Sequence, residues 1–395
     1  MRKIKLFLLK MFIKYNYNRN ILKKFIIIHL LFYNVNIISY FIIFFTYISY
    51  KNEIRRIEKY LKICQDLIII KKFKKLKVPK ISIISAIYNR GRFISRFLNS
   101  IQHQNFNDIE IILIDDCSID NSVNIINEYQ KEDERIFVIK NKKNRGTFIA
   151  RNLGVLYAKG KYVILPDPDD IISKNILKIC YNYAEKYNYE IIRFTSYKGS
   201  NKYILKLGNK PVYQPELSYN IFYGSNELEI IDFAINNKFI KKEVYIKALN
   251  SLNHFYLNMY MTYLEDQFMN YILQRTAKSF YYSKKIGYFY LQNSISITKN
   301  VYKISSLRIK FVFIYLKFIF EYSKNTKFQK DMANLWFNNY FSEVQPNLLK
   351  LQSKDDIFFY YNIINMYLKN EYITNKNKYL LKIFKSILEK KTKKF

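Results

Sequence analysis

Aspartates gather at two points of the chain, and each point follows a short run of apolar residues. The pair at 115–116 follows Ile109–Ile114, and the stretch Asp-Pro-Asp-Asp at 167–170 follows Tyr162–Leu165. Packed carboxylates repel one another unless a cation joins them. Their oxygens suit Mg2+ or Mn2+, ions that often bridge phosphate oxygens. Helix capping and turn formation are the alternative, but they cannot employ all three acids of the second group. The predicted metal ligands are Asp167, Asp169 and Asp170.

Among the arginines that lie between these acid groups in the sequence, two are candidates for contacting a ligand. No glycine-rich phosphate loop of the Walker or Rossmann type follows the first predicted strand. A diphosphate would therefore have to be held by a metal and by basic side chains. Arg145 and Arg151 are the candidates for that contact, and ordinary surface charge is the alternative for both.

The segments around these residues alternate between strand-like and helix-like patterns. The expected strands are Ile81–Ile87, Ile109–Ile114, Arg135–Lys140 and Tyr162–Leu165. The expected helices between them are Arg92–Gln104, Asp120–Tyr129 and Thr147–Ala158. This order predicts an α/β fold with a doubly wound, mostly parallel sheet. Ligands of such sheets bind beyond the carboxyl ends of the strands, so both acid groups are expected to face one crevice.

Composition excludes several classes of protein. With 3 Cys and 3 His among 395 residues, neither a disulfide framework nor a cysteine-based zinc site fits. The net charge of +35 invites a nucleic-acid interpretation. However, Lys, Asn, Ile, Tyr and Phe are abundant together, while Gly (8) and Pro (6) are scarce, as codon bias in an AT-rich genome would produce. We therefore expect no nucleic-acid partner.

The glycines divide the chain, because all of them lie between Gly91 and Gly287. Tight turns seldom form without glycine, so both flanks are expected to be helical or extended. Residues 1–24 form a basic tail, 51–78 a helical stem, and 299–395 a helical C-terminal appendage.

The uncharged run at residues 25–50 is long enough to cross a bilayer as a helix. We predict a retained single-pass transmembrane anchor there. A buried core helix and a cleaved signal peptide are the alternatives. The basic residues on the two sides are balanced, so the orientation is not determined.

The middle of the chain resembles the family 2 glycosyltransferases of the GT-A fold, strongly over 79–172 and more weakly to 298. Five of the family's motifs occur in order, at Ala86–Asn89, Ser100–Gln104, Glu110–Asp120, Asn144–Gly154 and Ala158–Asp170. The sequence departs from the family at Ala86, where Pro is commoner, and at Pro168, where a small polar residue is usual. Neither departure removes an acid.

The resemblance implies an inverting enzyme that uses a nucleotide sugar and Mn2+ or Mg2+. Tyr88 would stack on the nucleobase, Asp116 would accept a hydrogen bond from it, and Asp266 would be the general base. Glu265 is the possible second acid. A sugar hydroxyl does need a proton acceptor, although an acid at a helix start also suits the helix dipole. The implied nucleotide-binding residues are Ala86, Tyr88, Asn89, Asp116, Arg145, Arg151, Asp167 and Asp169.

The predicted function is transfer of a sugar from a nucleotide diphosphate sugar, with a UDP-sugar expected, to a hydroxyl of a glycan or glycoconjugate at a membrane. Two alternatives remain open. One is a polyprenyl-phosphate sugar transferase of the same family. The other is a catalytically inactive, membrane-tethered protein that binds sugar nucleotides.

Overall fold

The computed structural model describes residues 67–69, 78–199, 234–291, 306–322, 354–369 and 375–392. The predicted tail, the predicted anchor and most of the predicted stem lie outside this part of the chain. Within it, no helix combines the length and the apolar character needed to cross a membrane. The transmembrane anchor therefore stays a prediction.

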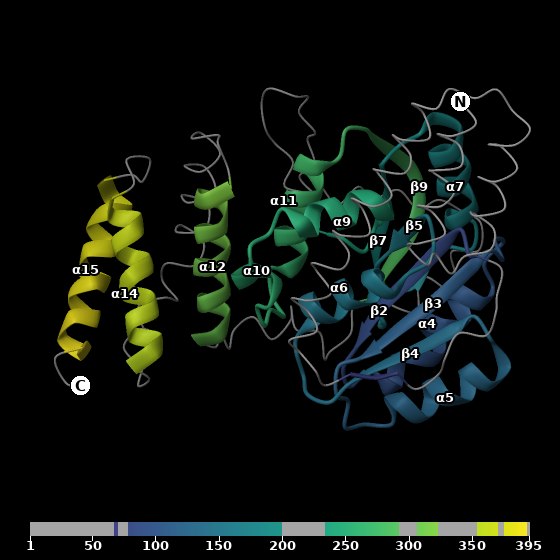
Figure 1. Ribbon diagram of the computed structural model, residues 1–395, viewed down its shortest axis with the longest axis horizontal. Coiled ribbons are helices and arrows are strands. Elements are labelled where there is room, and N and C mark those ends of the chain that lie inside the picture. Colours follow the sequence, from purple (N-terminus) through teal and green to yellow (C-terminus); the bar gives the residue numbers. More distant parts are fainter. Residues whose placement is uncertain are drawn as a thin grey trace, which may run out of the picture. The chain divides into compact units, whose positions relative to one another are not determined.

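A mixed sheet lies at the centre of the fold (Figure 1). It has nine strands in the order β1-β4-β3-β2-β5-β8-β7-β9-β6. The strands are β1 (Leu67–Ile69), β2 (Ile81–Ile87), β3 (Ile109–Asp115), β4 (Ile136–Asn141), β5 (Tyr162–Ile164), β6 (Ile171–Ile172), β7 (Ile191–Gly199), β8 (Lys238–Lys241) and β9 (Phe280–Leu291). β2 is parallel to both β3 and β5, and β3 is parallel to β4. The predicted parallel block of four strands is confirmed.

Helices cover both faces of this block because its strands are apolar on both sides. Alternate residues of a strand point to opposite faces. Ile83 and Ile111 belong to the core cluster formed with helices α4 (Gly91–Gln102), α5 (Ser122–Glu132) and α7 (Ile176–Tyr187). Ile84 and Ile114 instead contact α6 (Thr147–Tyr157), where Gly154 allows the close approach.

Two expectations about the sheet were wrong. Half of it is not parallel, because β8 runs antiparallel to both β5 and β7 and β6 runs antiparallel to β9. The predicted helical stem also contains the strand β1, which pairs antiparallel with β4. Both errors concern short strands whose pairing partners are distant in sequence, and local periodicity does not report such partners.

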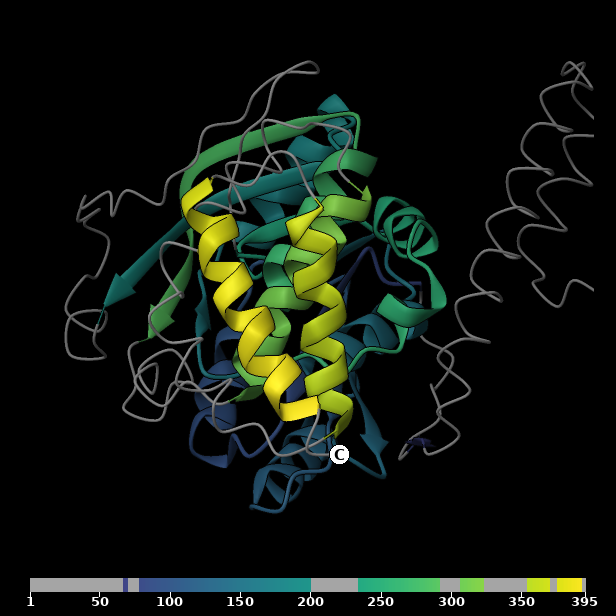
Figure 2. The ribbon, with the colours of Figure 1, turned by 90° about the vertical axis from the view of Figure 1, so that its left-hand side faces the viewer.

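The other described helices all follow β8 in the sequence. They are α9 (Lys242–Asn250), α10 (His254–Leu257), α11 (Glu265–Thr276), α12 (Ser306–Tyr322), α14 (Lys354–Leu368) and α15 (Asn375–Thr392). α14 and α15 pack against each other as a helical pair (Figure 2). The helical character predicted for the C-terminal region is confirmed for these described segments.

The helix α12 packs on α10 and α11 through aromatic rings. The centroid of Phe318 lies 4.1 Å from that of Phe268 on α11 and 5.2 Å from that of Tyr256 on α10. Phe268 in turn makes an edge-to-face contact with Phe148 on α6. The hydroxyl of Tyr256 donates a hydrogen bond to Glu321. α12 is therefore continuous with the core that supports α11 and the acids at its start.

Candidate active site

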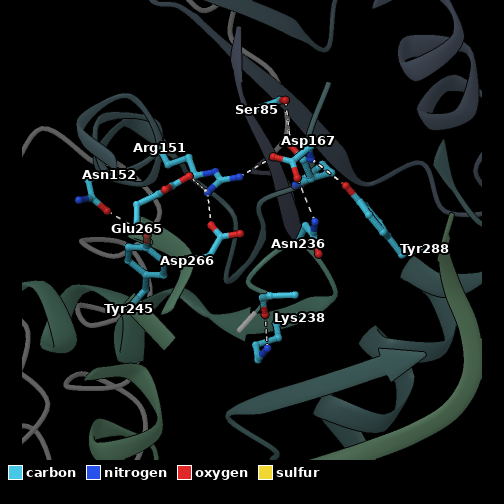
Figure 3. Close-up of polar contacts among 12 residues, drawn as sticks. Ser85, Arg151, Asn152, Asp167, Asn236, Lys238, Tyr245, Glu265, Asp266 and Tyr288 are labelled. Atoms are coloured by element: carbon cyan, nitrogen blue, oxygen red, sulfur yellow. Dashed lines mark hydrogen bonds and ion pairs between the residues drawn. The ribbon is translucent and has the colours of Figure 1, made fainter. Parts of the chain in front are cut away.

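The predicted site residues meet beyond the carboxyl ends of β2, β3 and β5, as expected for an α/β sheet. At the centre is Arg151 of α6, whose side chain is only 5% exposed. Its Nη2 lies 2.5 Å from Oδ1 of Asp167, and its Nη1 lies 3.5 Å from Oε1 of Glu265. The same Nη1 donates to Asp266 (Figure 3). One guanidinium therefore joins acids that are far apart in the sequence.

Glu265 and Asp266 form the first turn of α11, directly after Leu264, which has a left-handed backbone with φ 67°. This turn places both carboxylates at the positive end of the helix dipole. The prediction that the pair opens a helix is confirmed. A residue other than glycine in this conformation is uncommon and often accompanies functional sites.

The ionisation of the two acids is set by burial. Burial and then the charge of Asp266 raise the pKa of Glu265 to about 8, although Arg151 opposes the shift. Burial also raises the pKa of Asp266, against the charges of Arg151 and Lys238. One guanidinium cannot neutralise three carboxylates. A proton on Glu265 relieves part of the remaining repulsion between the carboxylates.

Asp167 is fixed from three sides in the loop after β5. Besides Arg151, its Oδ2 accepts a hydrogen bond of 2.9 Å from Nδ2 of Asn236. Its backbone N–H donates to the hydroxyl of Tyr288, at 3.0 Å. Ser85 of β2 holds the same loop by donating to the carbonyl of Pro166, at 2.9 Å. The position of this acid is therefore determined before any ligand arrives.

Asp170 has a structural partner on β9. Its Oδ2 accepts a 2.6 Å hydrogen bond from the Tyr288 hydroxyl, and its Oδ1 accepts a 2.9 Å bond from the N–H of Leu291. Burial, followed by the charges of Asp167 and Asp169, raises its pKa well above the ordinary value. Asp170 thus ties the loop that carries Asp167, Asp169 and Asp170, called the acid loop below, to the sheet. The sequence did not reveal this role.

The acid loop can be tested for its fit to a divalent ion. Among the described residues, no three His, Cys, Asp or Glu side chains are arranged as a metal cage. Mg2+, however, is usually held by one or two carboxylates together with substrate phosphates and water. The mutual repulsion of Asp167, Asp169 and Asp170 is the charge excess that such an ion would relieve. The donor set fits an ion whose coordination a diphosphate completes, and Asp169 is partly exposed.

The second part of the site surrounds Asp116, which is 3% exposed at the end of β3. Its carboxylate accepts hydrogen bonds from Nδ2 of Asn141, at 2.7 Å, and from the N–H groups of Arg145 and Gly146, at 2.9 and 2.8 Å. Burial nevertheless raises its pKa. Arg145 therefore reaches this acid through its backbone, and its predicted contact to a diphosphate stays a prediction.

The residues at the end of β2 lie beside Asp116. The N–H of Asp116 donates to the carbonyl of Ile87, at 2.7 Å, which brings the backbone just before Tyr88 beside that of Asp116. The ring of Tyr88 is 44% exposed. Asn89 has φ 52° and exchanges hydrogen bonds with the following loop at Ser118 and Ile119. Ala86 is a partly buried residue of β2. Their predicted contacts to a nucleotide stay predictions.

Several residues of the site were missed from the sequence. Asn236, Tyr288 and Asn141 each hold an acid in place, and Tyr245 donates a 2.9 Å hydrogen bond to Oδ1 of Asn152, beside Arg151. A polar side chain that binds another side chain at long range has no local pattern.

The comparisons with known proteins agree with this geometry. Residues 82–247 match the family described as Glycosyl transferase family 2. An uncharacterized glycosyltransferase of Mycoplasma genitalium is 30% identical over 226 residues, which are 55% of this chain and 72% of that protein. Glycosyltransferase GlyG of Streptococcus pneumoniae is 33% identical over 112 residues, or 28% of this chain and 37% of GlyG.

Solved structures are similar in fold. The crystal structure of residues 1–349 of Staphylococcus aureus TarS in complex with UDP-GlcNAc superposes with a TM-score of 0.54. The match covers 79% of this chain and 89% of that one, at 17% identity. The fold is thus that of the GT-A glycosyltransferases. The chain belongs to glycosyl transferase family 2.

The raised pKa of Glu265 predicts a pH-dependent stability. Between the ordinary pKa of 4.5 and about 8, the folded chain binds a proton at Glu265 that the unfolded chain releases. Stability must therefore fall as the pH rises through this window, by up to about 1.4 kcal/mol per pH unit for one proton. We expect Glu265→Gln to reduce this fall, measured by urea unfolding at pH 5 to 8.

Glu243→Gln is the matched control for this measurement. A hydrogen bond from Lys247 lowers the pKa of Glu243, so this acid is ionised in both states above pH 5. Its replacement should leave the slope between pH 5 and 8 unchanged. Equal slopes in the parent and in Glu265→Gln would show that Glu265 is not protonated at neutral pH.

Proposed function

We propose that the chain transfers a sugar from a UDP-sugar to a hydroxyl group of a glycan or glycoconjugate, with inversion of the anomeric configuration. The observation that carries the proposal is the meeting of Asp167 and Asp266 at Arg151. It brings Asp167, an acid of the motif at Ala158–Asp170, and Asp266, the proposed base, to one guanidinium. The complex of TarS with UDP-GlcNAc, a protein of the same fold, supports a uridine diphosphate donor.

The proposed reaction is a single displacement. Asp266 accepts the proton of the acceptor hydroxyl while that oxygen attacks the anomeric carbon from the face opposite the diphosphate, which inverts the configuration. Arg151 keeps Asp266 ionised and fixes its direction. Binding both substrates in one site supplies a further part of the acceleration, because it replaces a collision with a fixed approach. All of the acids that this scheme needs are present, which argues against an inactive binding protein.

We also propose a divalent ion, Mn2+ or Mg2+, at the acid loop. Asp169 would hold it, with Asp167 or Asp170 at its side and the diphosphate as the remaining ligand. When bound, the ion offsets the negative charge that builds on the leaving diphosphate. The charge excess of the loop is the observation that supports the proposal.

The general-base proposal separates chemistry from binding. Asp266→Asn keeps the size and much of the hydrogen bonding but lacks a basic carboxylate, so turnover should fall by roughly 10²- to 10⁴-fold. Donor affinity should hardly change, because the base acts on the acceptor. Turnover is measured kinetically and donor affinity by calorimetry. Activity within about threefold of the parent, with intact donor binding, would remove Asp266 from the mechanism.

The donor-side acid has the opposite expected phenotype. Asp116→Asn should weaken UDP binding and leave a smaller effect on turnover at saturating donor, because Asp116 shapes the loop at Gly146 and not the acceptor side. The two variants therefore control for each other. A variant that loses both properties would indicate misfolding, which a thermal melt detects.

The metal proposal is tested at Asp169. Asp169→Ala should abolish most of the gain in UDP affinity that Mn2+ provides, because a carboxylate of the ion's site is lost. Glu243→Ala, remote from the loop and paired with Lys247, is the control. UDP affinity that is equal with Mn2+ and with a chelator in the parent protein would contradict the proposal.

The membrane anchor is proposed from residues 25–50, whose uncharged sequence is its support. A chain that lacks residues 1–50 should leave the membrane fraction, because the remaining described helices are too short or too polar to span a bilayer. Sedimentation at high salt measures this. Full retention of the shortened chain in the pellet would refute the anchor.

A further inference from the structure

A second tyrosine faces the solvent near Asp116. Tyr260 lies in the short connection between α10 and α11, and its side chain is 42% exposed, nearly the same as Tyr88 at 44%. A single exposed tyrosine is ordinary on a protein surface. Here, however, both exposed tyrosines lie near Asp116, which is 3% exposed. Two flat, apolar ring faces therefore border a buried hydrogen-bond acceptor.

Backbone contacts fix Tyr260 to the Asp116 loop. Gly146, whose N–H donates to Asp116, has φ 83° and lies against the backbone of Met261. A Cβ at Gly146 would stand only 2.8 Å from the carbonyl oxygen of Met261. The same carbonyl accepts a 3.2 Å hydrogen bond from the N–H of Phe148. The backbone next to Tyr260 therefore packs directly on the loop that holds Asp116.

The other neighbour of Asp116 is the end of β2. The hydrogen bond from the N–H of Asp116 to the carbonyl of Ile87 fixes the backbone just before Tyr88. Burial, and then the charges of Asp116 and Tyr88, raise the pKa of Tyr260, so the three polar groups lie near one another. Two tyrosines from segments far apart in the sequence thus stand around one carboxylate.

The helix α12 packs against Tyr260. The ring centroids of Tyr260 and Phe311 are 6.4 Å apart, and Phe311 is 2% exposed. A buried ring restricts the positions that the neighbouring exposed ring can take. α12 lies beyond residues 82–247, the part of the chain that matches the family.

We propose that Tyr260 is a donor-binding residue that forms the second wall of a slot for the donor nucleobase, opposite Tyr88, and that Phe311 of α12 supports it. A planar base offers two π faces to the tyrosine rings and an edge N–H to Asp116. Each aromatic face that stacks on a base contributes measurable affinity. The inference rests on the proposed function, since it assumes a nucleotide donor. It assigns part of donor recognition to the C-terminal region.

The test is calorimetric titration of the full chain with UDP in the presence of Mg2+. Tyr260→Ala should weaken UDP binding roughly 5- to 100-fold, the range for loss of one base–aromatic stack. Tyr260→Phe keeps the ring and should bind within about twofold of the parent. Phe311→Ala should weaken binding less than Tyr260→Ala, because it removes the support and not the wall. Tyr187→Ala, at an exposed tyrosine of α7, is the control and should bind like the parent.

The outcomes separate this inference from the proposed function. If the parent binds UDP and Tyr260→Ala binds it within twofold, the second wall is refuted while the function stands. If Tyr260→Phe is as weak as Tyr260→Ala, the contribution is not stacking and the inference is overturned. If the parent chain binds neither UDP nor any other nucleoside diphosphate, the proposed function fails and the slot fails with it.

Discussion

A single buried guanidinium facing three carboxylates is the constraint on which the site depends. Arg151 cannot leave water unless acids surround it, and the acids cannot be packed together without it. It belongs to α6, whereas Asp167 follows β5 and Glu265 and Asp266 begin α11. The sheet, α6 and α11 must therefore adopt one relative arrangement. The charge of Arg151 sets the position of the acids and leaves a surplus of negative charge.

This surplus of negative charge explains why the acids of the site have different roles. Asp170 is held by the Tyr288 hydroxyl and the β9 backbone, and Glu265 retains a proton because burial raises its pKa to about 8. Asp167 and Asp266 remain beside Arg151, one on the side of the donor motif and one at the proposed base. The proposed mechanism uses Asp266 as the base and the loop of Asp167, Asp169 and Asp170 for the metal ion, while the protonated Glu265 supports the start of α11.

The donor side is governed by backbone geometry more than by charge. Asp116 accepts hydrogen bonds from the backbone N–H groups of Arg145 and Gly146. Because Gly146 has no side chain, the backbone of Met261, just before α11, packs directly against it. The aromatic contacts of α12 with α10 and α11 extend the same core outward. The helix α12 of the C-terminal region also contacts Tyr260 through Phe311. A helix far along the chain therefore packs close to the loop of Arg145 and Gly146.

The sequence alone determined the parallel strands β2 to β5, the helices between them and the acids at their carboxyl ends, because burial of both sheet faces imposes a local apolar pattern. It also indicated that Glu265 and Asp266 begin a helix. Only the tertiary structure decided the antiparallel strand pairings, the partners of Asp170 and the contact of Arg151 with acids 16 and 115 residues away. Such contacts depend on how distant segments pack, and a polar residue's own surroundings in the sequence do not record which buried charge it will meet.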